Sequence, residues 1–299
     1  MPKLDELNPQ RRSRLILSLM IVVLVLLAIP AFLWMRSSNA YLAQQSKSKM
    51  SPVIMVPGSS ATKNHFNQLV NLLNKDTDKK HSLMKIQVDN RYRVTTEGYI
   101  HRGDREPIIV IGFQNNHDGY QNIKKQARML DVAFDKLTND YHFNNFKAFG
   151  HSNGGLIWTY WLEHYYSQYS DAIKIKRLMT LGTPFNFAEK SINSPTQMFT
   201  DLVKYRKRIP DTLNVISVAG TESYDSDGLV PEESVQAGKY IYQKQVNHYT
   251  TMTVTGANAQ HSDLPQNKEI VRIIEQYLLD NKNEPAPVPN KKGELGAKN

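Results

Sequence analysis

A serine flanked by glycines is the residue of this chain best suited to covalent chemistry. It stands in Gly150-His151-Ser152-Asn153-Gly154, a G-x-S-x-G pattern that follows the apolar run 146–149 and precedes apolar residues at helical spacing. In a nucleophile elbow a strand turns sharply into a helix, and the glycines make room for a serine hydroxyl that projects above the strand end. The pattern and its setting therefore predict that Ser152 is a nucleophile.

A serine nucleophile needs a base, and nine histidines compete for that role. Functional groups of parallel α/β sheets gather beyond the carboxyl ends of the strands. His261 follows the predicted strand 250–255, whereas His248 precedes it. His164 lies twelve residues into the helix after the elbow, about 18 Å along the axis from the serine, and an elbow points the side chain of His151 elsewhere. We therefore predict that His261 is the base.

The acid that orients the base is expected after another strand. Asp225 and Asp227 both follow the apolar run 214–219. Asp227 is preferred because Gly228 provides a turn that can aim the carboxylate back into the site, and Asp225 stays an alternative. The order Ser152, Asp227, His261 is the order found in α/β hydrolases and differs from that of chymotrypsin-like and subtilisin-like enzymes.

Acyl transfer also needs donors for the oxyanion that develops in the transition state. Two backbone amides are candidates. One belongs to Asn153, directly after the nucleophile, and the other to Ser59, in the loop Pro57-Gly58-Ser59-Ser60 after the predicted strand 51–56. The amide of Ser60 is a near alternative to that of Ser59.

The elements that must position these residues alternate between strands and helices. Such alternation predicts an α/β fold with a mostly parallel sheet covered by helices on both faces. The long connection 184–212, with aromatic residues and a basic run at 204–208, predicts a small cap. The predicted strands are 51–56, 108–113, 146–150, 177–181, 214–219 and 250–255, with an edge hairpin from 85–88 and 92–99; the predicted helices are 64–73, 120–141, 154–167 and 268–279.

The amino-terminal part predicts a membrane anchor. Residues 15–35 form an uncharged apolar run long enough to cross a bilayer, and the arginines of segment 1–14 favour a cytoplasmic location for that end. The alternative is a signal peptide cleaved near residues 38–40. We expect a polar stalk at 36–50, a folded domain at 51–280 and a disordered tail at 281–299.

Charge and composition exclude several classes of function. The chain has 299 residues and a formal net charge of +9, but residues 50–280 hold 26 basic and 24 acidic residues. A near-neutral body argues against nucleic acid as the main partner, whereas basic ends suit an anionic membrane or wall. The chain contains no cysteine, which excludes a thiol nucleophile. We find neither an H-E-x-x-H helix nor a Walker loop, so we predict no metal and no cofactor.

With these motifs in place, the chain resembles the α/β-hydrolase superfamily, and in particular the membrane-anchored cell-surface hydrolases of Gram-positive bacteria. The resemblance covers about residues 51–280. One departure is Pro57, where many members have histidine before the oxyanion glycine, although the amide of Ser59 is still available. The matching segments are Pro57-Gly58-Ser59-Ser60, the strand from Pro107 to Phe113 followed by Asn115-Asn116, the elbow with Gly155 added, Leu181-Gly182-Thr183-Pro184-Phe185-Asn186, Asp227-Gly228-Leu229-Val230-Pro231 and His261-Ser262-Asp263-Leu264.

The resemblance implies hydrolase activity outside the cytoplasm. With the residues above it predicts a membrane-anchored serine hydrolase that cleaves a carboxylic ester, with a lipid or an acylated wall component as candidate substrates. An acyltransferase would use the same groups. Two further alternatives are a catalytically silent hydrolase fold that serves as a surface binding module and an amide-cleaving peptidase. The sequence predicts no oligomeric state.

Overall fold

The computed structural model describes residues 8–75, 80–222, 225–256 and 258–279. The chain divides into two compact units, Met1–Ser48 and Lys49–Asn299. The predicted tail at 281–299 and the first seven residues of the predicted cytoplasmic segment lie outside the described residues.

The first unit is built around one long helix, α1 (Pro9–Ser46). Asn8 caps its start, because the side-chain oxygen accepts a hydrogen bond from the amide of Gln10 at 3.2 Å. By length and composition the stretch Gln10–Arg36 could cross a membrane, and its apolar side chains are exposed. The predicted anchor lies inside this helix, which continues through most of the predicted stalk as far as Ser46.

The second unit contains an eight-stranded sheet with the order β3-β2-β4-β1-β5-β6-β7-β8. Every neighbouring pair is parallel except β2 and β3, which form an antiparallel hairpin at one edge. The carboxyl ends of the parallel strands therefore share one side of the sheet. The strands are β1 (Val53–Val56), β2 (Leu83–Val88), β3 (Val94–Gly98), β4 (Ile108–Phe113), β5 (Asn145–His151), β6 (Lys174–Leu181), β7 (Asn214–Thr221) and β8 (His248–Thr255).

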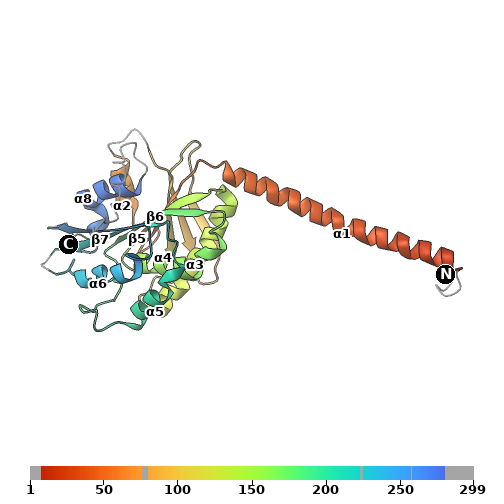
Figure 1. Ribbon diagram of the computed structural model, residues 1–299. Helices are drawn as coiled ribbons and strands as arrows, with labels where there is room; N and C mark the ends of the chain where they lie inside the picture. Colours follow the sequence, from red (N-terminus) through yellow and green to blue (C-terminus); the bar gives the residue numbers. More distant parts are fainter. Residues whose placement is uncertain (1–7, 76–79, 223–224, 257, 280–299) are drawn as a thin grey trace, which may run out of the picture. The chain divides into compact units, whose positions relative to one another are not determined.

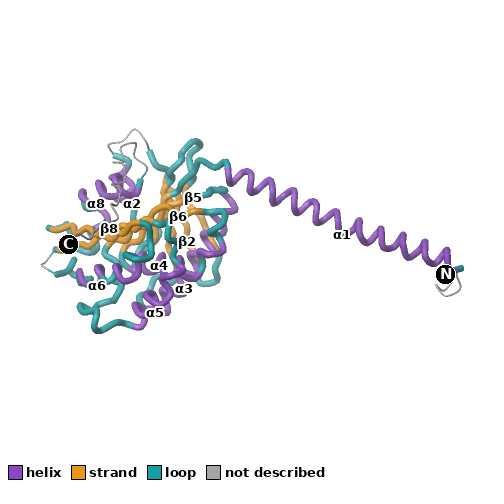
Figure 2. The backbone as a smooth tube through the Cα atoms, in the orientation of Figure 1, coloured by secondary structure: helices purple, strands orange, loops and turns teal. Residues whose placement is uncertain are grey.

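Helices cover both faces of this sheet (Figures 1 and 2). Helices α3 and α4 lie on one face, and α2 and α8 lie on the other. The helical elements of the second unit are α2 (Asn67–Leu73), α3 (Tyr120–Tyr141), α4 (Asn153–His164), η2 (Tyr166–Gln168), α5 (Gln197–Tyr205), η3 (Arg206–Arg208), α6 (Glu232–Gln236), α7 (Lys239–Tyr242), η4 (Leu264–Gln266), α8 (Lys268–Ile273) and the π-helical turn η5 (Ile274–Leu278).

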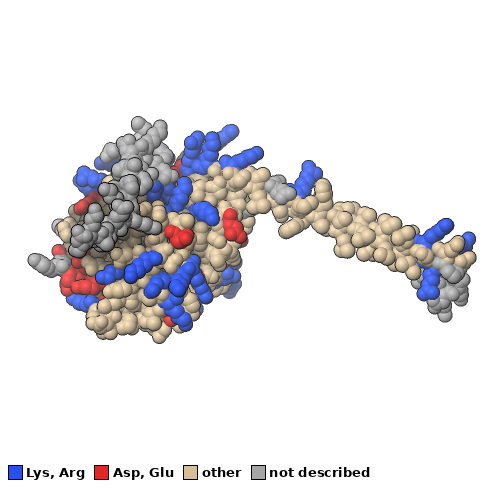
Figure 3. All heavy atoms as spheres, in the orientation of Figure 1, with Lys and Arg blue, Asp and Glu red and all other residues tan. Residues whose placement is uncertain are grey.

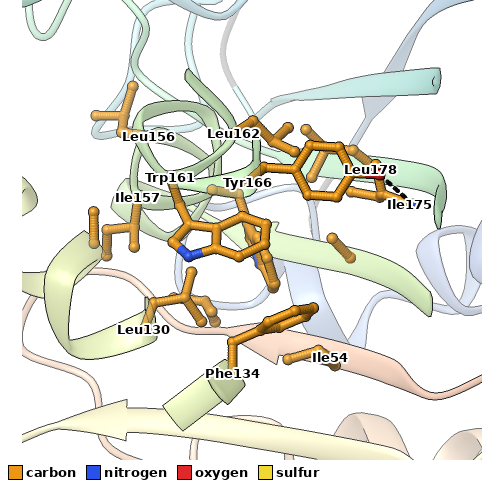
Figure 4. Close-up of a cluster of buried hydrophobic side chains, with 14 of the residues drawn as sticks. Ile54, Leu130, Phe134, Leu156, Ile157, Trp161, Leu162, Tyr166, Ile175 and Leu178 are labelled. Atoms are coloured by element: carbon orange, nitrogen blue, oxygen red, sulfur yellow. Dashed lines mark hydrogen bonds between the residues drawn. The ribbon is translucent and has the colours of Figure 1, made fainter. Parts of the chain in front are cut away.

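The larger core lies between the sheet and helices α3 and α4. Figure 4 shows Trp161 of α4 near Phe134 and Leu130 of α3, and the rings of Trp161 and Phe134 are 4.7 Å apart. The hydroxyl of Tyr166 accepts a hydrogen bond from the amide of Ile175 at 3.2 Å, which ties the end of this layer to β6. Close aromatic packing of this kind fixes α4, and with it the turn from which α4 starts.

The α/β fold, the mostly parallel sheet and the edge hairpin are confirmed. Several boundaries differ from the prediction: α2 begins at Asn67 rather than at residue 64, and the closing helix changes to a π-helical turn at Ile274. Within the predicted cap at 184–212, α5 buries Met198, Phe199 and Leu202 in the larger core. The role of this segment as a cap stays a prediction.

Candidate active site

The turn between β5 and α4 has the strained geometry of an elbow. Ser152 has φ 55° and ψ −130°, a conformation that non-glycine residues rarely adopt. A Cβ on Gly150 would lie 2.4 Å from the amide nitrogen of Gly155, and a Cβ on Gly154 would lie 2.0 Å from the carbonyl oxygen of Val56. Both contacts are too close for any side chain, so the sequence needs glycine on both sides of this serine.

Ser152 lies where the loop after β1 meets the elbow. A Cβ on Gly58 would lie 2.5 Å from Cβ and 3.0 Å from Oγ of Ser152, so only glycine lets the two segments approach this closely. The amide of Ser152 donates to the carbonyl oxygen of Leu181 at the end of β6 (2.8 Å). Ser152 is 8% exposed, and its hydroxyl makes no hydrogen bond within the described part of the chain.

The predicted acid and base meet directly. Nδ1 of His261 lies 2.6 Å from Oδ2 of Asp227, and both residues are buried. The other carboxylate oxygen of Asp227 accepts hydrogen bonds from the amides of Leu229 (3.1 Å) and Val230 (2.7 Å), which fix its orientation. The amide of His261 donates to the carbonyl oxygen of Asp227 (2.8 Å), so main chain and side chain both join the two loops.

The end of β6 brings this pair next to the elbow. Gly182 has a positive φ of 54°, and a Cβ there would lie 3.2 Å from both Oδ2 of Asp227 and Nδ1 of His261. Its neighbour Leu181 accepts the amide hydrogen bond of Ser152. The serine and the Asp227–His261 pair therefore contact consecutive residues of one strand end. The transfer of a proton from Ser152 to His261 stays a prediction.

Asp225, the alternative acid, is occupied elsewhere. Its carboxylate forms an ion pair with Lys190 at 2.6 Å, and both side chains are at least half exposed. The hydrogen bond from Lys190 lowers the pKa of Asp225.

The two predicted oxyanion amides lie at the same edge of the sheet, because Ser59 follows β1 and Asn153 follows β5, which are parallel neighbours. Asn153 is the first residue of α4, and its amide has no hydrogen-bond acceptor among the described residues. The amide of Ser59 also lacks one, whereas the amide of Ser60 donates to the carbonyl oxygen of Asn116 at 2.7 Å. Between the two alternatives, Ser59 therefore has the amide available for an oxyanion. The positive end of the α4 dipole favours negative charge at this point.

Two further histidines pack against this site. Nε2 of His151 lies 3.0 Å from the carbonyl oxygen of His261, and Nδ1 of His151 lies 3.0 Å from Nε2 of His65. The rings of His65 and His151 stack, with centroids 5.1 Å apart. A carbonyl oxygen only accepts, so Nε2 of His151 carries a proton; its Nδ1 is then an acceptor in the neutral ring and Nε2 of His65 is the donor.

The electrostatics agree with neutral rings at both positions. Burial, followed by the charge of His261 and that of His65, holds the pKa of His151 well below its usual value. Burial and the charge of His261 also lower the pKa of His65. These two residues therefore link the loop after β1, the elbow and the loop of His261 without adding charge.

Three residues of this site are not predicted from the sequence. The prediction excludes His151 because an elbow turns its side chain away from the serine, yet in the structure that side chain lies against the carbonyl oxygen of His261. His65 lies beyond the carboxyl end of β1, and Asp118 lies beyond that of β4. The Oδ1 atom of Asp118 accepts from the side-chain amide of Asn153 at 2.6 Å. The strand-end rule applied to every polar residue would have found His65 and Asp118.

Comparisons with known proteins agree with this fold. Residues 41–281 match a family described as "Alpha/beta hydrolase of unknown function (DUF915)". A protein described as a cell surface hydrolase, from Lactobacillus plantarum WCFS1, is 54% identical, with a TM-score of 0.71 over 77% of this chain and 92% of its own. A gene product of Listeria innocua is 23% identical and shares the fold, with a TM-score of 0.72 over 79% of this chain and 96% of its own. No curated protein matches this chain.

Proposed function

On the premise that this chain belongs to the α/β-hydrolase family matched by residues 41–281, we propose that it is a serine hydrolase that cleaves carboxylic esters outside the cell. The observation that carries the proposal is the hydrogen bond of 2.6 Å between Asp227 and His261, which lies beside the strained turn of Ser152. A buried acid–imidazole pair next to a serine held in an elbow is the arrangement that activates a hydroxyl for acyl transfer.

The proposed reaction begins with attack of Ser152 Oγ on the ester carbonyl carbon. Nε2 of His261 takes the hydroxyl proton, and Asp227 stabilises the imidazolium through Nδ1. The amides of Ser59 and Asn153 donate to the oxyanion. His261 then gives its proton to the leaving alcohol, and an acyl-enzyme remains on Ser152. Water, deprotonated by the same imidazole, releases the carboxylic acid and restores the serine.

His151 and His65 act in this scheme as positioning residues. The Nε2 proton of His151 holds the carbonyl of His261, and the amide of His261 is held by Asp227. The main chain of the base is thus fixed from two sides. Because a misplacement of about 1 Å can cost about 10²-fold in rate, this restraint matters for turnover.

The proposed location rests on α1. Its stretch Gln10–Arg36 has the length and composition of a membrane span, and the arginines before residue 15 favour a cytoplasmic amino end. The second unit would then lie outside the cell, in keeping with the description of the Lactobacillus relative as a cell surface hydrolase. A cleaved signal peptide would also deliver this unit to the outside.

The proposal is tested with the full chain in a mild non-ionic detergent and a panel of p-nitrophenyl esters of increasing acyl length. We expect the wild type to hydrolyse members of the panel and Ser152→Ala to lose about 10⁶-fold in turnover. Ser262→Ala, which changes an exposed serine next to the base, is the matched control and should retain activity. Full activity in Ser152→Ala would refute the assignment, and a folded but inactive wild type would favour a binding module.

A further inference from the structure

Positive side chains without a carboxylate partner gather around η3 and α7. Some other surface cations in the described part of the chain pair with acids, for example Lys63 with Glu97 and Lys190 with Asp225. No Asp or Glu of the described residues lies within ion-pair distance of the cluster. Its members are Lys204, Arg206, Lys207, Arg208, Lys239 and Lys244.

Four of these cations surround one cavity of about 370 Å³. Arg206 and Lys207 of η3 line one part of it, and Lys239 and Lys244 line another, together with the ring of Tyr240. The other lining residues are uncharged, and none is an acid. We call this space the cationic cavity.

The walls of the cationic cavity are held by contacts of their own. Nη1 of Arg206 donates to the carbonyl oxygen of Tyr240 at 3.3 Å, which connects η3 to α7. Nε2 of Gln245 donates to the carbonyl oxygen of Ile209 at 3.1 Å. Nζ of Lys239 lies 5.1 Å from the centroid of the Tyr240 ring. The positive groups are therefore attached to a connected frame rather than to separate loops.

The local charge contrasts with the balance of the body. Residues 50–280 carry nearly equal numbers of acidic and basic residues, so uncompensated positive charge here means that acids are concentrated elsewhere. Figure 3 shows several Lys and Arg side chains, with a few acids among them, on the part of the visible face where Figure 1 labels α3, α4 and α5. Like charges around one cavity repel each other, and an anion in the cavity would relieve that repulsion.

We propose that the cationic cavity binds a linear polyanion that carries successive phosphate groups. Arginine offers phosphate a planar set of donors, and lysine offers a point charge. A second cavity, of about 260 Å³, shares Lys239 and Tyr240 with the first, but its lining includes the acid Glu233 and Lys190, which pairs with Asp225. Four cations line the first cavity, and Lys204 and Arg208 stand in or next to the same turn η3, so the cluster carries more positive charge than a single phosphate would neutralise, which fits a chain of phosphates. The site is separate from Ser152, because none of the catalytic residues lines either cavity.

Short inorganic polyphosphate, fluorescently labelled at one end, is the probe, and binding to the full chain in neutral detergent is followed by anisotropy. The variant Lys207→Ala/Lys244→Ala removes two lining charges from different elements. At about 1 kcal/mol for each charge, we expect an affinity about thirtyfold lower at low salt. Turnover of a p-nitrophenyl ester should not change, which separates failure of this proposal from failure of the proposed hydrolase activity.

Lys176→Ala/Lys268→Ala is the matched control, since both lysines are exposed and neither lines the cationic cavity or the cavity that adjoins it. For this control we expect the affinity for polyphosphate to fall by less than about threefold, because distant surface charges are screened by salt. Equal losses of affinity in the two double variants would overturn the proposal, because they would mean that the positive surface as a whole attracts the anion. If orthophosphate competes as well as polyphosphate at equal phosphate concentration, the site recognises single phosphates rather than a linear polyanion, and the proposal is overturned. Binding to phosphatidylglycerol vesicles but not to polyphosphate would point to lipid headgroups and overturn the proposal as well.

Discussion

The two ends of the sheet each bury a charged or chargeable pair, and the pairs differ in what surrounds them. Near the amino end, Lys147 of β5 pairs with Glu106, which precedes β4, and the two side chains are 0% and 3% exposed. At the carboxyl end, Asp227 pairs with His261, and their side chains are 1% and 8% exposed. Burial and short contact are therefore common to both pairs.

The difference lies in the groups next to each pair. Beside Asp227 and His261 stand a serine with strained backbone and a hydroxyl that makes no hydrogen bond among the described residues, as well as the available amides of Ser59 and Asn153. Glu106 and Lys147 neutralise each other's charge inside the protein. A buried pair indicates chemistry when unused donors and a strained nucleophile accompany it, and otherwise indicates a structural role. Substitutions at the two ends should therefore affect different quantities.

Among substitutions in the two buried pairs, the largest effect is expected for Asp227→Asn. The amide side chain favours the wrong imidazole tautomer and cannot stabilise the imidazolium, so turnover should fall by about 10⁴-fold while the protein stays folded. Ester hydrolysis with a circular dichroism check measures this. Asp225→Asn is the matched control, since Asp225 pairs with Lys190, and its turnover should match the wild type. Equal losses in the two variants would mean that the acid is wrongly assigned.

At the opposite end, Lys147→Met should affect stability and leave chemistry intact. It removes the cation that faces the buried carboxylate of Glu106, and breaking a buried ion pair costs about 3–5 kcal/mol in the free energy of unfolding. Denaturant titration measures the loss, and turnover per folded molecule should not change. The double variant Lys147→Met/Glu106→Gln should recover part of the stability. A variant that is fully stable but inactive would reverse the roles assigned to the two ends.

His151→Phe tests whether the elbow positions the base. Phenylalanine fills similar space but offers no proton to the carbonyl of His261, so kcat should fall by about 10²-fold, with a KM within about threefold of the wild type. His151→Gln keeps a side-chain donor and should restore part of kcat. If both variants keep the wild-type kcat, the contact between His151 and His261 has no role in turnover.

A pH-dependent effect concerns Glu163 of α4, a buried carboxyl group whose two oxygens have no hydrogen-bond partner among the described residues. Burial raises its pKa from 4.5 to about 9. Between these values the folded state keeps a proton that the unfolded state has lost, so the free energy of unfolding falls as pH rises, by up to about 1.4 kcal/mol per pH unit. Below the unfolded pKa this penalty is absent.

Glu163→Gln removes that proton difference. Relative to the wild type, the variant should therefore gain stability between pH 5 and pH 8, as measured by denaturant titration at both values. Glu189→Gln, at an exposed position, serves as control. Its difference from the wild type in the free energy of unfolding should be the same at both pH values. A constant difference for Glu163→Gln as well would contradict the buried, protonated state of this carboxyl.

The sheet could be predicted well from the sequence because it depends on local signals. Apolar runs define the strands, and glycines define the turns at Ser152 and Asp227. The structure brings Asp227 and His261 into contact, and the roles of the site residues stay a prediction. The contacts of His65 and His151 could not be predicted this way, since they depend on how three loops meet across β1, β5 and β8. The cationic cavity could not be predicted from the sequence either. The sequence shows the basic run 204–208, but Lys239 and Lys244 come next to that run only in the folded chain.

The central claim is that the hydroxyl of Ser152 is activated by His261. Its most direct measurement is labelling with a fluorophosphonate, followed by peptide mass spectrometry of the full chain. The account predicts one modified peptide, with the label on Ser152, and loss of labelling in His261→Ala. A label on a different serine, or equally fast labelling of Ser152 in His261→Ala, would contradict it.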